Sequence, residues 1–165
     1  MATTSALAIE SVSRIVMQKD LVGRPMEILL VEDALMDARV AIEALREGDV
    51  KHRLTLIRDG LEAMEFLGQR GKFVKAPRPD LVLLDLLLPG KSGLELLSAI
   101  RNDYALRELP VVVLTASDAE EDKVNCEMFA IDAYMTKPFN LSKFHSIIKK
   151  LRRYWMDDVI LPSVD

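Results

Sequence analysis

Leu81-Val82-Leu83-Leu84-Asp85-Leu86-Leu87-Leu88-Pro89-Gly90 is the stretch of this chain from which the fold can be inferred. Apolar residues run without alternation into the carboxylate of Asp85, and the run breaks at Pro89-Gly90. An unalternating run of this length predicts a strand that is buried on both faces, as in a parallel sheet. Asp85 then lies at the carboxyl end of that strand, where open α/β sheets place their ligands and their chemistry.

The rest of the chain alternates in the same way between strand-like and helix-like segments. Apolar runs that end in polar or charged residues predict strands at 27–31, 52–58, 81–84, 111–114 and 130–135. Apolar residues spaced three or four apart predict helices at 34–47, 61–68, 94–100, 119–128 and 141–155. This order predicts an α/β fold, a doubly wound parallel sheet with right-handed crossovers.

The same spacing predicts which helix residues face the sheet. In the acidic helix 119–128, Val124 and Met128 are expected on the inward side. In the last helix, the inward side is expected to consist of Leu141, Phe144, Ile148 and Leu151.

Composition excludes several classes of protein. The 165 residues suffice for one domain with short extensions, and no apolar run is long enough to cross a bilayer, so membrane insertion is excluded. The net charge of −4 gives no general attraction to nucleic acid. Cys126 is the only cysteine, which excludes a disulfide framework and fits a reducing compartment. The start of the chain shows no secretory signal, so we expect a cytoplasmic protein.

The chain divides into one main domain and two short flanks. Residues 1–25 form an N-terminal extension with weakly helical spacing, ended by Pro25, to which we assign no function. The main domain spans 26–155, and 156–165 form a C-terminal tail. No output module for DNA binding or catalysis is expected.

Polar residues that close the parallel strands should meet at one edge of the sheet. They are Glu32 and Asp33 after the first strand, Asp85 after the third, Thr115 after the fourth and Lys137 after the fifth. Carboxylates gathered in this way repel one another, which either raises their pKa values or favours a bound cation. Mg²⁺ suits such oxygen ligands and leaves coordination positions for a phosphoryl oxygen.

The remaining groups at this edge suit a phosphoryl group. Lys137 provides a point charge for a phosphate, and Thr115 provides a hydroxyl that can donate a hydrogen bond to it. A carboxylate can itself attack phosphorus and form an acyl phosphate. Asp85 is the best candidate because the loop that follows it can turn a backbone carbonyl toward a metal ion.

These markers together resemble the receiver domain of two-component response regulators. Glu32-Asp33, Asp85, Thr115 and Tyr134-x-x-Lys137-Pro138 occur in the family's order within residues 26–155. The resemblance implies a flavodoxin-like five-stranded sheet of order 2-1-3-4-5 with five helices. It also implies that Asp85 accepts a phosphoryl group from a phosphohistidine on a sensor histidine kinase or a histidine phosphotransfer protein.

The resemblance further implies a role for each matching residue. Mg²⁺ is expected to be held by Asp33, Asp85 and the Leu87 backbone carbonyl, with Glu32 acting through water. Lys137 would pair with the phosphoryl group, and Thr115 and Tyr134 would form the conformational switch. The Lys137–Pro138 peptide bond is expected to be cis.

A narrower resemblance connects the chain to the single-domain regulators that are paired with phytochromes. It rests on Tyr154-Trp155, Val159-Ile160-Leu161-Pro162, Arg58-Asp59-Gly60 and Pro77-Arg78-Pro79-Asp80. The sequence departs from that group at Leu87, where Asn is usual. Apolar residues 159–161 have little left to cover within their own domain, and the resemblance points the same way, so we expect them to join a homodimer.

Two other functions fit a fold of this class. A phosphatase with an Asp nucleophile would need a second Asp two residues after the first, and Leu87 occupies that position. A flavodoxin-like flavin protein would need a Ser/Thr/Gly-rich phosphate loop where this chain has Glu32-Asp33-Ala34. The sequence therefore favours a phosphoacceptor that signals through protein–protein contacts rather than an enzyme.

Overall fold

The computed structural model describes residues 25–157, with side chains as far as Leu151. Its parallel sheet has the order β2-β1-β3-β4-β5, which confirms the predicted fold and strand order. The strands are β1 (Met26–Val31), β2 (His52–Ile57), β3 (Leu81–Leu84), β4 (Val111–Thr115) and β5 (Ala133–Thr136).

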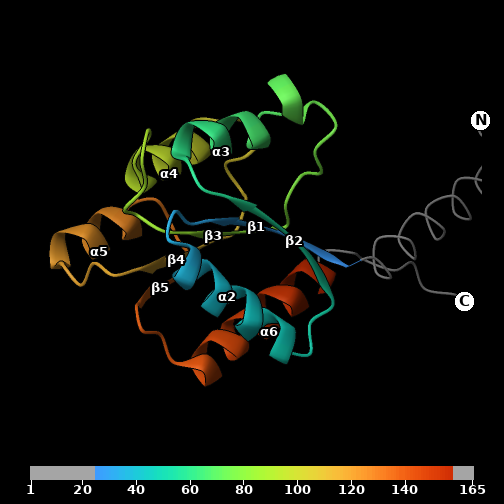
Figure 1. Cartoon of the computed structure of the whole chain (residues 1–165), viewed down its shortest axis with the longest axis vertical. Helices are drawn as coiled ribbons and strands as arrows, with labels where there is room; N and C mark the ends of the chain where they lie inside the picture. Colours follow the sequence, from blue (N-terminus) through green and yellow to red (C-terminus); the bar gives the residue numbers. More distant parts are fainter. Residues whose placement is uncertain (1–24, 158–165) are drawn as a thin grey trace, which may run out of the picture.

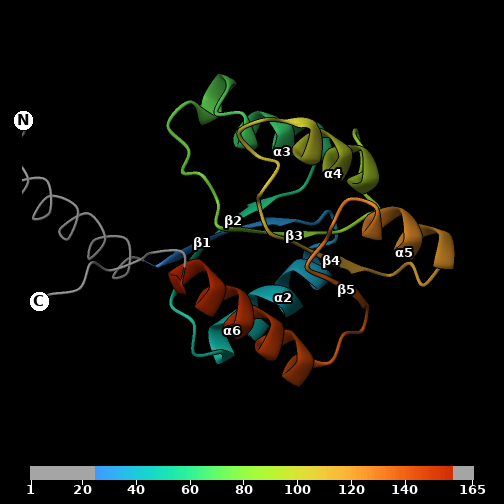
Figure 2. The same cartoon turned by 180° about the vertical axis from the view of Figure 1, so that it is seen from behind.

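Helices cover both faces of this sheet (Figures 1 and 2). They are α2 (Leu35–Glu47), α3 (Gly60–Leu67), α4 (Gly93–Asn102), α5 (Glu120–Glu127) and α6 (Leu141–Asp157). Helices α2 and α6 lie on one face, and α3, α4 and α5 lie on the other. A short 3₁₀ helix, η1 (Gly71–Phe73), falls in the connection before β3 and was not predicted.

The apolar runs of the central strands are unalternating because each strand supplies both layers of core. Leu29 and Val31 of β1 pack with α3, α4 and α5, whereas Ile28 and Leu30 pack with α2 and α6. The alternate residues of β3 divide in the same way between the two clusters. Successive side chains of a strand point to opposite faces, so in a sheet covered on both sides every residue of a central strand faces the core and is apolar.

Side-chain oxygens that accept hydrogen bonds from backbone N–H groups fix the starts of two helices. Asp59 Oδ1 accepts from the backbone N–H groups of Leu61 and Glu62 at 2.8 and 3.0 Å, so Asp59 is the N-cap of α3. Ser92 Oγ accepts from the N–H of Glu95 at 3.2 Å at the start of α4. Both helices therefore begin on the loops that surround the carboxyl edge of the sheet.

Three expectations from the helical spacing are wrong. Val124 and Met128 are 46% and 77% exposed, whereas Cys126 is fully buried and carries the contact of α5 with the core. Helix α5 ends at Glu127, so Met128 only caps it, and the short helix turns a single buried residue inward. Leu141 is also 45% exposed: it is the first residue of α6 and lines a surface hollow together with Pro138 and Phe139.

The last strand also begins later than predicted. The segment 130–135 was expected to be extended, but Ala130 has a φ of +52° and the strand starts at Ala133. Asp132, just before β5, is held to the start of β4: its carboxylate accepts from the N–H of Val111 at 2.9 Å, and its own N–H donates to the Val111 carbonyl at 2.8 Å. The turn before β5 is therefore fixed by a side chain that the apolar pattern does not reveal.

The expected flanks lie largely outside the described residues. This holds for the N-terminal segment 1–24, with its weakly helical spacing, and for the tail 158–165. The division of the chain at 26 and 155 stays a prediction. Within the described part of the chain, no helix is both long and apolar enough to cross a membrane.

Candidate functional site

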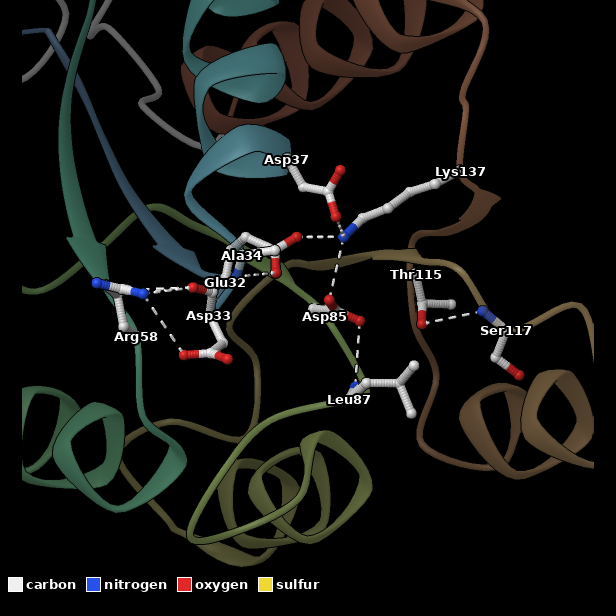
Figure 3. Close-up of polar contacts among 10 residues, drawn as sticks. All are labelled: Glu32, Asp33, Ala34, Asp37, Arg58, Asp85, Leu87, Thr115, Ser117 and Lys137. Atoms are coloured by element: carbon white, nitrogen blue, oxygen red, sulfur yellow. Dashed lines mark hydrogen bonds and ion pairs between the residues drawn. The ribbon is translucent and has the colours of Figure 1, made fainter.

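Strand ends bring the predicted site residues to the carboxyl edge of the sheet. Val31 of β1 pairs with Leu84 of β3, so the next residues, Glu32 and Asp85, leave the sheet side by side. Both are nearly buried, at 3% and 6% exposed. Thr115 ends the neighbouring strand β4 and is fully buried. Figure 3 shows Glu32 and Asp85 at the ammonium group of Lys137, with Thr115 to one side, its hydroxyl toward Ser117.

Lys137 is the centre of this group. Its Nζ lies 3.0 Å from Asp85 Oδ2 and 3.1 Å from Asp37 Oδ2, and it also contacts Glu32 Oε1. The side chain is only 13% exposed. Lys137 follows β5, whereas its partners come from the ends of β1 and β3 and from α2, so one cation joins four segments. The Lys137–Pro138 peptide bond is cis, as expected.

Asp37 was not among the predicted site residues. It belongs to the first turn of α2, four residues after Asp33. A helix that follows a parallel strand begins at the carboxyl edge of the sheet, so acidic residues in its first turn can reach that edge. The position of Asp37 in this first turn could therefore have indicated that it belongs to the site.

The buried charges shift one another's pKa values. Burial raises the pKa of the Glu32 carboxyl, and the neighbouring Asp85 adds to the rise against the pull of Lys137. Burial acts in the same direction on Asp85, but the N–H of Leu87, the side chain of Glu32 and the ammonium of Lys137 together outweigh it and lower the pKa of Asp85. Burial opposes the charge of Lys137, yet its three carboxylate partners raise its pKa. The lowered pKa favours the ionised form of the Asp85 carboxyl.

The loop after Asp85 is packed tightly. The N–H of Leu87 donates to Asp85 Oδ1 at 3.1 Å, while the Leu87 side chain is 63% exposed. Gly93 closes the loop through a hydrogen bond from its N–H to the carbonyl of Leu86, at 3.0 Å. A Cβ on Gly93 would lie 2.4 Å from Leu86 Cα and 2.5 Å from the carbonyl oxygen of Asp85. Only glycine allows this approach, which holds the loop after Asp85 in place.

Asp33 lies at the rim of the site. Its side chain is 53% exposed, and its carboxylate is 3.8 Å from the guanidinium of Arg58. Arg58 also donates two hydrogen bonds to the backbone carbonyl of Asp33, at 3.1 and 2.9 Å. Arg58 directly follows β2, and its contact with Asp33 was not predicted. A basic residue at a strand end, where carboxylates gather, is the signal that could have indicated it.

Thr115 and Tyr134 are linked through Ser117. The Thr115 hydroxyl accepts from the N–H of Ser117 at 3.3 Å, and the Tyr134 hydroxyl donates to the Ser117 carbonyl at 2.7 Å. Burial raises the pKa of Tyr134, so this hydroxyl keeps its proton at neutral pH. The sequence singled out both residues but not Ser117, whose backbone connects them.

The donor chemistry at this edge fits a hard divalent cation. Glu32, Asp33 and Asp85 supply carboxylate oxygens, the ligands that Mg²⁺ and Mn²⁺ prefer. Among the described residues, however, no group of three or more His, Cys, Asp or Glu side chains is arranged to hold a metal ion. Lys137 and Arg58 are the cations that face these carboxylates in this structure. The predicted ligand set, including the Leu87 carbonyl, therefore stays a prediction.

Comparisons with known proteins agree with this geometry. Residues 28–149 match the family described as the response regulator receiver domain. The response regulator Rcp1 of Synechocystis sp. is 41% identical over 139 residues, which cover 84% of this chain and 95% of Rcp1.

Solved structures give the same result. The Mn²⁺-bound form of Rcp1 superposes with a TM-score of 0.70 at 41% identity, covering 84% of this chain and all of that one. The phosphorylated cyanobacterial phytochrome response regulator RcpA gives a TM-score of 0.70 at 42% identity, with 85% and 100% covered. The bacteriophytochrome response regulator AtBRR gives 0.69 at 33% identity, with 86% and 99% covered.

Proposed function

This chain belongs to the response regulator receiver domain family, and we propose that it carries a transient phosphoryl group on Asp85 with the help of Mg²⁺. The observation that carries the proposal is the environment of Asp85. The carboxylate is almost buried at the end of β3, held by Lys137 at one oxygen and by the Leu87 N–H at the other. The phosphatase and flavin-protein alternatives are not favoured by the family match.

The proposed reaction is a transfer of a phosphoryl group between two side chains. A carboxylate oxygen of Asp85 attacks phosphorus on a phosphohistidine; a P–O bond forms, the P–N bond breaks, and its electron pair stays on the imidazole nitrogen. Lys137 would pair with the phosphoryl oxygens, and the Thr115 hydroxyl would donate a hydrogen bond to them. The chain would promote only its own phosphorylation and dephosphorylation, without a separate substrate.

A bound Mg²⁺ would neutralise charge that develops on the phosphoryl oxygens. Asp33 and Asp85 would hold it directly, together with the Leu87 backbone carbonyl, and Glu32 would act through water. The Mn²⁺ in the related Rcp1 structure supports a divalent cation with the same preference for oxygen ligands.

The relatives also support a class of partner. Rcp1 and RcpA are response regulators, and RcpA is described as a phytochrome response regulator. We propose a phytochrome-type sensor histidine kinase, or a phosphotransfer protein that relays from one, as the source of the phosphoryl group. Output would follow through protein contacts, including a homodimer, and without nucleic acid.

Phosphorylation from a small donor tests the proposal. The parent should gain one phosphoryl mass when incubated with acetyl phosphate and Mg²⁺, read by intact mass spectrometry. Asp85→Asn should gain none, because the nucleophile is gone, and chelating the metal should suppress the gain in the parent. Asp118→Asn is the matched control, since it removes an exposed carboxylate from the loop after β4. An equal gain in Asp85→Asn and the parent would refute the assignment.

A further inference from the structure

The ammonium group of Lys137 has no hydrogen-bond donor left for a new partner. Lysine carries three N–H donors and no acceptor. Glu32, Asp37 and Asp85 each accept from Lys137 in this structure, the latter two at 3.1 and 3.0 Å. A phosphoryl group that arrived on Asp85 could therefore gain a hydrogen bond from Lys137 only if one of these contacts opened.

The three contacts differ in how easily water can replace them. The side chains of Glu32 and Asp85 are 4% and 8% exposed, so opening either contact would leave a nearly buried carboxylate without its partner. The side chain of Asp37 is 45% exposed. Water can solvate its carboxylate as soon as the ammonium leaves, so this contact costs least to break.

Figure 3 shows the same difference in position. Asp37 reaches Lys137 from the start of α2, whereas Asp85 reaches it from the opposite side, at the end of β3. A small movement of the ammonium away from Asp37 would keep it within reach of the group on Asp85. Asp37 would then be a carboxylate close to a new dianion, and like charges repel.

On the premise of the proposed phosphorylation of Asp85, we propose that Asp37 is the exchangeable partner of Lys137. As a positioning residue, Asp37 holds the ammonium in the resting site and gives it up when Asp85 carries a phosphoryl group. The contact therefore opposes the phosphorylated state. Its removal should favour binding of a phosphoryl group or of a group that mimics one.

Binding of beryllofluoride, a mimic of a phosphoryl group on a carboxylate, measures this effect. Measured with Mg²⁺ by calorimetry or NMR titration, Asp37→Asn should bind beryllofluoride about two- to fivefold more tightly than the parent, the range expected for one exposed ion pair. Asp37→Glu keeps the charge on a longer side chain and should return the affinity toward that of the parent. Asp118→Asn removes a charge that makes no contact with Lys137, so its affinity should match the parent's. Equal affinities for Asp37→Asn and the parent would overturn the inference.

A second measurement needs no phosphoryl group. The Lys137 ammonium protons should exchange with water several-fold faster in Asp37→Asn than in the parent or in Asp118→Asn, measured by ¹⁵N NMR. An unchanged exchange rate would overturn the role of Asp37 even if Asp85 is phosphorylated. Conversely, a parent that does not bind beryllofluoride would count against the proposed function, while the exchange rates would still report on Asp37.

Discussion

Glu32 and Asp85 lie side by side at the ends of two neighbouring strands, yet their pKa values move in opposite directions. Burial raises the pKa of Glu32, whereas the Leu87 N–H, the Glu32 side chain and Lys137 together outweigh burial at Asp85 and lower its pKa. The lowered pKa of Asp85 stabilises the fold above the ordinary value of 3.8, and this stability is lost as the pH falls through the folded pKa. The raised pKa of Lys137 contributes stability at neutral pH that is lost only as the pH rises through its folded pKa.

Leu87 is predicted to prolong the phosphorylated state. Its side chain is exposed in the loop that follows Asp85, and it offers no hydrogen bond to a water that attacks phosphorus. Leu87→Asn should shorten the phosphoryl half-life about two- to tenfold, the range that one hydrogen bond supplies. The loss of phosphoryl mass after removal of the donor measures it. Leu87→Met should behave as the parent, and an unchanged or longer half-life in Leu87→Asn would contradict shielding.

Thr115 is predicted to couple phosphorylation to partner binding. Its hydroxyl now contacts the Ser117 N–H, and the Ser117 carbonyl holds Tyr134. A dianion on Asp85 would give the hydroxyl a stronger partner, so the Ser117 segment and Tyr134 should follow. Thr115→Ala should still be phosphorylated but lose most of the phosphorylation-dependent change in affinity for a cognate partner. Thr115→Ser keeps the hydroxyl and should retain the change; an equal response in Thr115→Ala would rule out this coupling.

The sequence predicted the central residues of the site but not their supports. Glu32, Asp85, Thr115 and Lys137 could be found because each follows a strong strand signal. The supporting contacts depend on local geometry. Asp37 reaches Lys137 from the first turn of a helix, and Arg58 reaches Asp33 from the end of an edge strand. The backbone of Ser117 connects the hydroxyls of Thr115 and Tyr134. No periodicity of apolar residues reports on such contacts.

At the scale of elements, the loop between β3 and α4 determines how Asp85 is presented. Gly93→Ala would press a Cβ against the backbone of Leu86, and it should lower the free energy of unfolding by about 1–3 kcal/mol or more, the range for overpacking. Gly48→Ala is the matched control, because its Cβ would meet Leu45 O and His145 Cδ2 at 3.4 and 3.5 Å, which is ordinary contact. Denaturant unfolding compares the two. If Gly93→Ala is no less stable than Gly48→Ala, the close approach is not needed.

Sheet and helices differ in how well the sequence predicts them. Strands β1, β3 and β4 were found because a strand covered on both faces must be apolar throughout. The edge strand β2 is only partly buried and was found from the alternation of apolar and polar residues. The prediction of the inward side of α5 was wrong because the helix has only eight residues, about two turns, and four of them are acidic. Such a short helix shows no clear period of apolar residues. Cys126 takes the buried position, where burial raises the pKa of its thiol to about 11. With one buried residue, α5 has no apolar face from which its orientation could be predicted.

For the whole molecule, we propose a homodimer in which the segment 156–165 takes part. Val159, Ile160 and Leu161 lie outside the described residues, and the proposal rests on their apolar character and on the likeness to phytochrome response regulators. Light scattering should give a dimer for the full chain and a monomer for a chain stopped after Tyr154, at tens of micromolar. A chain whose three apolar residues 159–161 are replaced by Ser should also be monomeric. The same oligomeric state for all three chains would exclude this segment from the interface.

For the molecule as a whole, we propose that Asp85 is the one aspartate that accepts the phosphoryl group. Locating the modified residue in the parent chain tests this assignment. After incubation with acetyl phosphate and Mg²⁺, reduction with borohydride converts an aspartyl phosphate into homoserine, and peptide mass spectrometry identifies its position. We expect homoserine at position 85 and at no other aspartate. Homoserine at Asp33, Asp37 or Asp118, with Asp85 unmodified, would contradict it.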